Sequence, residues 1–216
     1  MSRRKNRVGI VIGTGPSLAN DIELIRQLKA DDRVILFGIN NTFSDFKLDA
    51  WIACDPAWHD LYGRIGGDFD KWHWSSAICK KYDYRYIEGR WVNGVSPVGA
   101  DWISLNHGSG PQALNLATSI YCCDLVLLVG HDMTYRPGQR RHYFDISDIP
   151  GEYPQALRKW SHFEKPKREG GAHPDGDGIL YNYKWIAEQK DLPPIINCTP
   201  GSAMTWFPIR PLADFA

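Results

Sequence analysis

The chain has 216 residues, of which 43% are hydrophobic and 23% are charged. This length suits one well-packed domain and is too short to divide comfortably into two, and the composition is ordinary for a soluble globular protein. Basic and acidic residues number 25 each, so the formal net charge is zero. Bulk charge therefore gives no support for binding to nucleic acid or to an anionic membrane.

The cysteines and the start of the chain indicate a cellular compartment. The five cysteines form no Cys-x-x-Cys pair and are odd in number, which is typical of reduced thiols in a cytoplasmic protein. The apolar run at residues 8–12 follows a basic start but is too short for a signal peptide or a membrane span. We expect a cytoplasmic protein without a membrane span.

Apolar runs alternate with helical patterns along the chain. The runs predict strands at residues 8–12, 33–39, 49–54, 77–80, 84–88, 125–129 and 195–198. The helical patterns lie at residues 18–30, 111–122 and 179–190. This alternation predicts an α/β fold, a single Rossmann-like domain over residues 1–216 with a mostly parallel twisted sheet flanked by helices.

Two stretches do not follow the alternation. Residues 58–76 contain three tryptophans and a Gly-Gly pair, and residues 134–178 show no clear periodicity. Long segments of the second kind are usually lids, binding loops or disordered. We interpret residues 134–178 as a partly helical lid over the strand ends, with a helix at residues 153–163.

The first predicted strand runs into a glycine turn, GTGPSL, at residues 13–18. A dinucleotide fingerprint would need a glycine where Leu18 stands, and a P-loop would need Gly-Lys before its Ser or Thr. Neither motif is complete. The turn fits a nucleotide site of another type, formed by Gly13, Thr14, Gly15 and Ser17, or a purely structural connection.

Small or polar residues also follow the other predicted strands. They are Asn40 and Asn41, Asp55 and Pro56, Gly130 to Asp132, and Thr199 to Ser202. Ligands of open parallel sheets bind beyond the carboxyl ends of the strands, so these residues predict one shared site. Ser109 and Gly110 begin a predicted helix in the same manner as the first turn.

The lid holds the candidate catalytic groups. His173 follows Gly-Gly-Ala and could deprotonate an acceptor hydroxyl near neutral pH. Tyr135 and Tyr143 flank a run of arginines and could stabilise a departing phosphate, although a solvated basic loop explains the cluster equally well. The Asp175-Gly176-Asp177 run indicates a turn and a helix cap before it indicates a metal motif, and we predict no metal site.

The ordered set of motifs resembles the bacterial sialyltransferases of glycosyltransferase family 42 and the related DUF115 proteins, which include MptE-like pterin diphosphokinases. The resemblance spans most of the chain, although no single motif is specific. Its motifs are GTGPSL (13–18), FGINNTF (37–43), GSGPQALNLATSI (108–120), LVLLVGHDM (125–133), the loop histidine and INCTPGSAM (196–204).

The sialyltransferases imply a metal-independent, inverting transfer of a sugar from a CMP-linked donor to a hydroxyl of a glycan or small molecule. The resemblance assigns the donor phosphate and ribose to Thr14 and Gly15, the nucleotide to Asn40, and the sugar carboxylate or phosphate to Ser109 and Gly110. It makes His173 the base and places Tyr143 near the phosphate. The chain departs from the family pattern at Thr14 and Asp55, where asparagines are expected.

Two other functions stay open. The MptE-like relatives imply an ATP-dependent diphosphokinase, in which Mg²⁺ would be needed and Asp55, Asp132, Asp175 and Asp177 would be candidate ligands. The arginine- and lysine-rich runs at residues 139–141 and 165–168, with tryptophans that could stack on bases, would suit a nucleic-acid modifying or binding protein. Zero net charge counts against the second of these.

Overall fold

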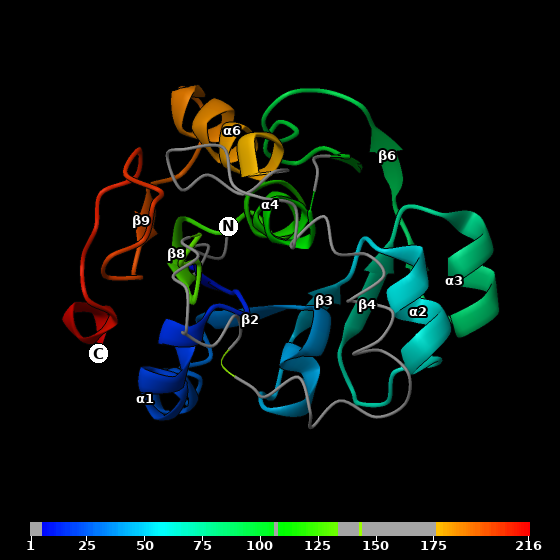
Figure 1. Ribbon diagram of the computed structural model, residues 1–216, viewed down its shortest axis with the longest axis horizontal. Coiled ribbons are helices and arrows are strands. Elements are labelled where there is room, and N and C mark those ends of the chain that lie inside the picture. Colours follow the sequence, from blue (N-terminus) through cyan, green and yellow to red (C-terminus); the bar gives the residue numbers. More distant parts are fainter. Residues whose placement is uncertain (1–5, 106–107, 134–142, 144–175) are drawn as a thin grey trace, which may run out of the picture.

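The computed structural model describes residues 6–105, 108–133, 143 and 176–216 (Figure 1). Its strands are β1 (Val8–Ile12), β2 (Val34–Ile39), β3 (Ala50–Ile52), β4 (Asp70–His73), β5 (Arg85–Tyr86), β6 (Glu88–Arg90), β7 (Trp102–Ser104), β8 (Leu125–Val129) and β9 (Ile195–Asn197). Its α-helices are α1 (Ile22–Leu28), α2 (Pro56–Tyr62), α3 (Ser76–Tyr82), α4 (Ser109–Asn115) and α6 (Gly176–Glu188). Shorter 3-10 segments are η1 (Pro16–Asn20), η2 (Asn40–Ser44) and η6 (Leu212–Phe215), and η3 (Leu116–Ile120) is a π-helical segment.

A parallel seven-stranded sheet forms the centre of the fold, in the order β5-β4-β3-β2-β1-β8-β9. Strand β1 pairs with both β2 and β8, so that Val8 lies opposite Val34 on one side and Leu125 on the other. The chain steps outward from β1 to β5 and then returns to the other side of β1 with β8 and β9. The order of the strands therefore reverses between β1 and β8, as expected for a Rossmann-like α/β fold.

Helices cover both faces of the sheet. Helices α4 and α6 lie over one face and α1 lies over the other (Figure 1). Along β1, Val11 belongs to the core cluster that includes Leu114 of α4 and Tyr183 of α6, whereas Ile10 belongs to the cluster that includes Ile25 of α1. Because both faces are covered, β1 is a continuous apolar run and shows no alternation.

A buried polar network joins α4 to a second, two-stranded sheet of β6 and β7. Asn115 Oδ1 accepts hydrogen bonds from the backbone N–H of Ser96 at 3.1 Å and of Ser104 at 2.7 Å. Its Nδ2 donates to the hydroxyls of Ser96 and Ser119, both at 2.7 Å. The predicted helix 111–122 is thus confirmed as α4 and η3, and Asn115 links it to the β7 segment.

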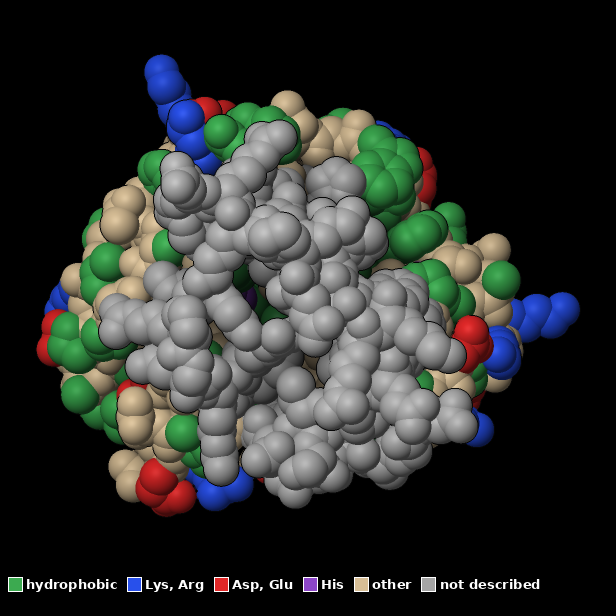
Figure 2. All heavy atoms as spheres, in the orientation of Figure 1, with side chains coloured by type: hydrophobic (Ala, Val, Ile, Leu, Met, Phe, Trp, Pro, Cys, Tyr) green, Lys and Arg blue, Asp and Glu red, His purple; other side chains and the backbone are tan. Residues whose placement is uncertain are grey.

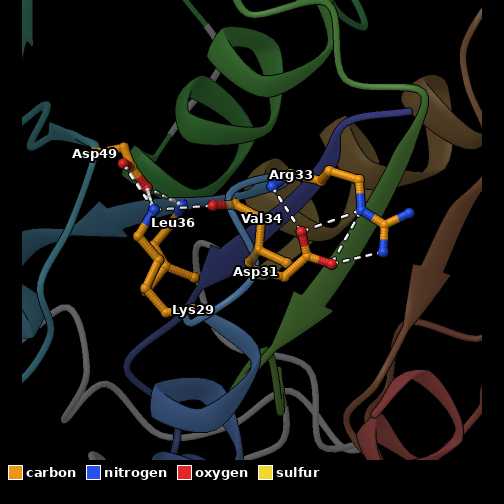
Figure 3. Close-up of polar contacts among 6 residues, drawn as sticks. All are labelled: Lys29, Asp31, Arg33, Val34, Leu36 and Asp49. Carbon is orange, nitrogen blue, oxygen red and sulfur yellow. Dashed lines mark hydrogen bonds and ion pairs between the residues drawn. The ribbon is translucent and has the colours of Figure 1, made fainter. Parts of the chain in front are cut away.

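At the opposite, amino end of the sheet, one carboxylate fixes the start of β2. Asp49 Oδ2 accepts the Leu36 N–H at 2.7 Å, and Asp49 Oδ1 accepts from Lys29 Nζ at 2.8 Å (Figure 3). Lys29 Nζ also donates to the Val34 carbonyl at 2.9 Å. The Asp49 side chain thus ties β2 to the residue before β3, and the predicted strand 49–54 is shortened to Ala50–Ile52.

The structure differs from the predicted elements at three places. The predicted strand at 77–80 is helix α3, in which Cys79 and Tyr82 are buried at helical spacing and Asp83 ends the helix at φ 61°. The predicted strand at 84–88 divides between β5 and β6, which belong to different sheets. The stretch 58–76, which does not follow the predicted alternation and for which no element was predicted, contains most of α2 and all of β4.

The remaining expectations about the chain as a whole concern thiols and membranes. All five cysteines are free. Within the residues that the structure describes, no helix is long and apolar enough to cross a membrane.

Candidate functional site

The carboxyl ends of the strands bring together many of the residues predicted for the site. They are Gly13, Thr14, Gly15 and Ser17 after β1, Asn40 after β2, Asp55 after β3, Ser109 and Gly110 at the start of α4, and Asp132 after β8. This edge includes the position between β1 and β8 where the strand order reverses, which is where ligands of such sheets bind.

The glycine turn after β1 is packed against the turn after β8. The N–H of Gly13 donates to the Val129 carbonyl at 2.7 Å, and the N–H of Gly15 donates to the Gly130 carbonyl at 2.8 Å. A Cβ on Gly13 would overlap the backbone of Gly130, and one on Gly15 would overlap the Asp132 carboxylate. Both glycines are therefore required by close packing between the two turns.

A protein carboxylate lies in the turn to which the family resemblance assigns the donor phosphate. Asp132 Oδ2 accepts a hydrogen bond from the Ser17 hydroxyl at 2.8 Å, and the Ser17 N–H lies 3.3 Å from Asp132 Oδ1. The negative charge that such a turn would attract is thus supplied by the chain itself. While Asp132 keeps this position, a ligand phosphate would have to share the turn with this carboxylate.

Leu18 stands where a dinucleotide fingerprint has its third glycine, and it is fully buried. A Cβ on Gly130 would lie 2.9 Å from the Cβ of Leu18, and Gly130 has φ +71°. The two turns therefore approach each other closely even though Leu18 is not glycine, because the glycine that permits the approach lies after β8. Sequence reasoning missed this exchange because Leu18 and Gly130 are far apart in the chain.

Asn40, Ser109 and Cys54 join the ends of β2 and β3 to the start of α4. The Ser109 hydroxyl donates to Asn40 Oδ1 at 3.0 Å and accepts the Cys54 N–H at 3.0 Å. The backbone of Asn40 has φ 45°, and its carbonyl accepts from Trp51 Nε1 at 2.8 Å. Burial raises the pKa of the Cys54 thiol, so this cysteine is protonated at neutral pH.

His131 is buried at the same edge and serves packing rather than proton transfer. Its Nε2 donates to the Val11 carbonyl at 3.2 Å, and its Nδ1 accepts from the Tyr183 hydroxyl at 3.0 Å. Burial lowers the pKa of His131 to about 4. The histidine is therefore neutral near pH 7, with both ring nitrogens engaged. Gly110 packs here, because a Cβ on it would overlap the Tyr183 hydroxyl.

Two further predicted residues lie beside the strand ends. Asp55 begins the turn into α2, where its carbonyl accepts the Trp58 N–H at 3.1 Å. The backbone N–H of Tyr143 donates to the Thr14 carbonyl at 3.1 Å, which brings this residue to the first turn. The Tyr143 hydroxyl donates to Asp45 Oδ2 at 2.6 Å. Burial is the main cause that raises the pKa of this phenol, and the Asp45 carboxylate raises it further.

The other predicted catalytic residues, Tyr135 and His173, lie outside the described residues, as do almost all of the proposed lid 134–178 and its helix 153–163. Their roles stay predictions. The described residues contain no group of three or more His, Cys, Asp or Glu side chains that could hold a metal ion.

Sequence reasoning missed a group of buried rings beyond β3 and β4. His59 Nε2 donates to the Ala53 carbonyl at 2.8 Å, and His73 Nδ1 accepts the Ser75 N–H at 2.8 Å. The two histidine rings lie 4.9 Å apart between centroids. Burial lowers the pKa of both, that of His73 to about 3. Isolated histidines in a sequence give no signal for such a pair.

A groove of about 810 Å³ opens at the opposite edge of the sheet, near the amino ends of β3 to β5. Several of its charged groups neutralise one another, since Lys29 Nζ lies 2.7 Å from Asp49 Oδ2 and an Arg85 nitrogen lies 2.9 Å from Asp70 Oδ1. We place the candidate site at the carboxyl edge, where the polar residues converge and where open parallel sheets bind ligands.

The described surface carries charges of both signs. Basic and acidic side chains lie next to one another around the rim of the face seen in Figure 2. Exposed pairs include Arg64 with Asp83 at 2.6 Å and Lys81 with Asp60 at 2.8 Å. A mixed surface of this kind gives little of the long-range attraction that nucleic-acid binding uses.

Comparisons of the chain with protein-family models, with curated proteins and with solved structures return no match. The resemblance to the sialyltransferases and the DUF115 proteins therefore stays a prediction from the sequence.

Proposed function

We propose that the protein is a glycosyltransferase that binds a nucleotide-activated sugar, CMP-linked by preference, at the carboxyl edge of the sheet and transfers the sugar to a hydroxyl acceptor. The observation that carries the proposal is that two hydrogen-bonded polar pairs lie at this edge, Ser109 with Asn40 and Ser17 of the β1 glycine turn with Asp132, where the strand order reverses between β1 and β8. Nucleotide ligands favour this location in Rossmann-like folds.

The polar groups at this edge suit different parts of a nucleotide. The Asn40 side-chain amide supplies N–H donors, which suit a phosphate oxygen or a base carbonyl. Asp132 supplies a carboxylate, which suits hydroxyl donors such as those of a ribose and disfavours a phosphate. We therefore place the donor phosphate on the β2 side of the edge and outside the β1 turn.

The proposed reaction breaks the bond between the anomeric carbon and the phosphate oxygen, and the nucleoside monophosphate leaves with that electron pair. The acceptor hydroxyl oxygen forms the new bond to the anomeric carbon, and its proton passes to His173. A histidine suits this role because its ordinary pKa of about 6.5 leaves it largely neutral at pH 7. His131, which lies at this edge, has both ring nitrogens hydrogen-bonded within the protein and is not a candidate.

The proposal is tested by incubating the protein with CMP-, UDP- and GDP-linked sugars and measuring thermal stabilisation and release of the nucleotide. One nucleotide class should raise the melting temperature, and CMP release should persist in excess EDTA. Failure of every nucleotide and nucleotide sugar to stabilise the protein would refute the proposal.

One observation favours a second function, the MptE-like diphosphokinase. Asp55 and Asp132 both follow parallel strands at the carboxyl edge, and carboxylates are ligands that Mg²⁺ prefers. Release of AMP from ATP that requires Mg²⁺, together with loss of activity in EDTA, would support this function over the first.

A further inference from the structure

The Ser109 hydroxyl is fully committed within the protein. It accepts the Cys54 N–H at 3.0 Å and donates its single proton to Asn40 Oδ1 at 3.0 Å. The residue is 6% exposed. Since a hydroxyl carries one proton, Ser109 has none to donate to a ligand carboxylate or phosphate in this arrangement.

The same contacts determine how Asn40 faces the site. Its backbone is held in the left-handed region at φ 45°, and its carbonyl is tied to Trp51 Nε1. Its Oδ1 is tied to Ser109, so the Nδ2 end of the amide faces away from that hydroxyl. Asparagine is one of the few residues with a side chain that adopts this backbone conformation readily.

The Asn40 Nδ2 group finds no hydrogen-bond acceptor within the described parts of the chain. Asn40 is partly exposed, so its two amide protons are available to a ligand. Without Ser109, the amide could turn over and present its oxygen instead. A site that requires a donor at this point therefore depends on the Ser109 proton.

We propose that Ser109 is a positioning residue that acts through Asn40 and does not itself contact the sugar donor. It fixes the side-chain amide so that Nδ2 donates to an acceptor oxygen of the bound nucleotide. This inference rests on the proposed function. It differs from the role that the family resemblance gives to Ser109, which is direct contact with a carboxylate or phosphate of the ligand.

Affinity for CMP, measured by calorimetry, distinguishes the two roles in a double-mutant cycle. Ser109→Ala should weaken CMP binding by about 5- to 10-fold, the loss of roughly one hydrogen bond. In an Asn40→Ala background, the further change Ser109→Ala should alter the affinity less than about 2-fold, because the residue through which Ser109 acts is gone. Ser109→Thr, which keeps the hydroxyl, should stay within about 3-fold of the natural chain.

Ser76→Ala, at the exposed start of α3, is the matched control and should leave CMP affinity unchanged. Equal effects of Ser109→Ala in the natural and the Asn40→Ala backgrounds would overturn the inference and indicate direct contact, and so would no effect of Ser109→Ala in the natural chain. If CMP, UMP, GMP and AMP all fail to bind the natural chain, the proposed function falls and this inference falls with it. Because Ser109→Ala is made in both backgrounds, any general loss of stability that it causes is common to both and cancels when the two effects are compared.

Discussion

Asp132 accepts a hydrogen bond from the Ser17 hydroxyl at 2.8 Å, and this contact joins the turn after β1 to the turn after β8. The carboxylate lies against Gly15, so the two turns that flank the reversal of strand order fit together only when this glycine has no side chain. The turn to which the family resemblance assigns the donor phosphate therefore also packs against the turn after β8. Binding and stability at this edge share the same residues.

Gly15→Ala should lower the free energy of unfolding by about 2 to 3 kcal/mol, because its Cβ would overlap the Asp132 carboxylate and the Gly130 carbonyl. The cost is steric, since Gly15 has an ordinary φ of −66°. Gly66→Ala is the matched control, because a Cβ there meets nothing within 4 Å. It should be neutral or slightly stabilising. Urea unfolding checks both, and equal stabilities would contradict the packing described for Gly15.

The stability of the protein should fall between pH 7.5 and pH 5 because of buried histidines. Burial lowers the folded-state pKa of His131 to about 4 and that of His73 to about 3. The unfolded state, with a pKa of about 6.5, binds more protons in this range, so stability is present above about pH 6.5 and declines as the pH falls toward the folded-state values. Each histidine should contribute about 2 kcal/mol of this loss by pH 5.

Urea unfolding of His131→Gln at the two pH values isolates one of these contributions. The variant lacks one titrating group, so its loss of stability between pH 7.5 and pH 5 should be smaller than that of the natural chain by about 2 kcal/mol. An unchanged pH dependence would mean that His131 is not buried in its neutral form.

Asn115→Ala should destabilise the fold by about 3 to 5 kcal/mol, because it leaves the buried N–H groups of Ser96 and Ser104 without their acceptor. Asn20→Ala, at an exposed position at the end of η1, is the control and should change stability by less than about 0.5 kcal/mol. A loss below about 1 kcal/mol for Asn115→Ala would mean that water replaces the amide readily.

The sequence predicted the sheet better than the edges of its elements. The runs that became β1, β2 and β8 are continuous, apolar and mostly buried, which is typical of strands covered on both faces of a parallel sheet. The short segment 77–80 was ambiguous, because a few apolar residues fit either a strand or a helix. Strand β4 was missed because its residues are mostly only partly buried and include two charges.

Polar residues after each strand were found from the sequence, and their partners were not. The pairing of Ser17 with Asp132 spans 115 positions, and that of Ser109 with Asn40 spans 69. No local pattern encodes such distant contacts. These contacts change the binding roles expected of the residues, because the first places a carboxylate in the glycine turn and the second uses the hydroxyl proton of Ser109.

If His173 is the general base of the proposed transferase, His173→Ala should lower turnover by about 10²- to 10⁴-fold and leave donor affinity within about 2-fold. The reason is that a base acts on the acceptor hydroxyl and not on the nucleotide. Calorimetry with CMP and single-turnover transfer measure the two quantities separately. Turnover at the natural rate, with a confirmed donor and acceptor, would remove His173 from the mechanism.

The most direct test of the account is the binding of CMP and CMP-linked sugar to the natural chain, to Asn40→Ala and to Lys47→Ala. Lys47 lines the groove at the amino edge of the sheet and serves as the control for that location. We predict that the nucleotide stabilises the natural chain and Lys47→Ala equally, by an amount that grows with the logarithm of one plus the ratio of ligand concentration to Kd, and that Asn40→Ala loses at least about 10-fold in affinity. Binding that survives in Asn40→Ala and disappears in Lys47→Ala, or the absence of binding by any nucleotide to the natural chain, would contradict a nucleotide site at the carboxyl edge.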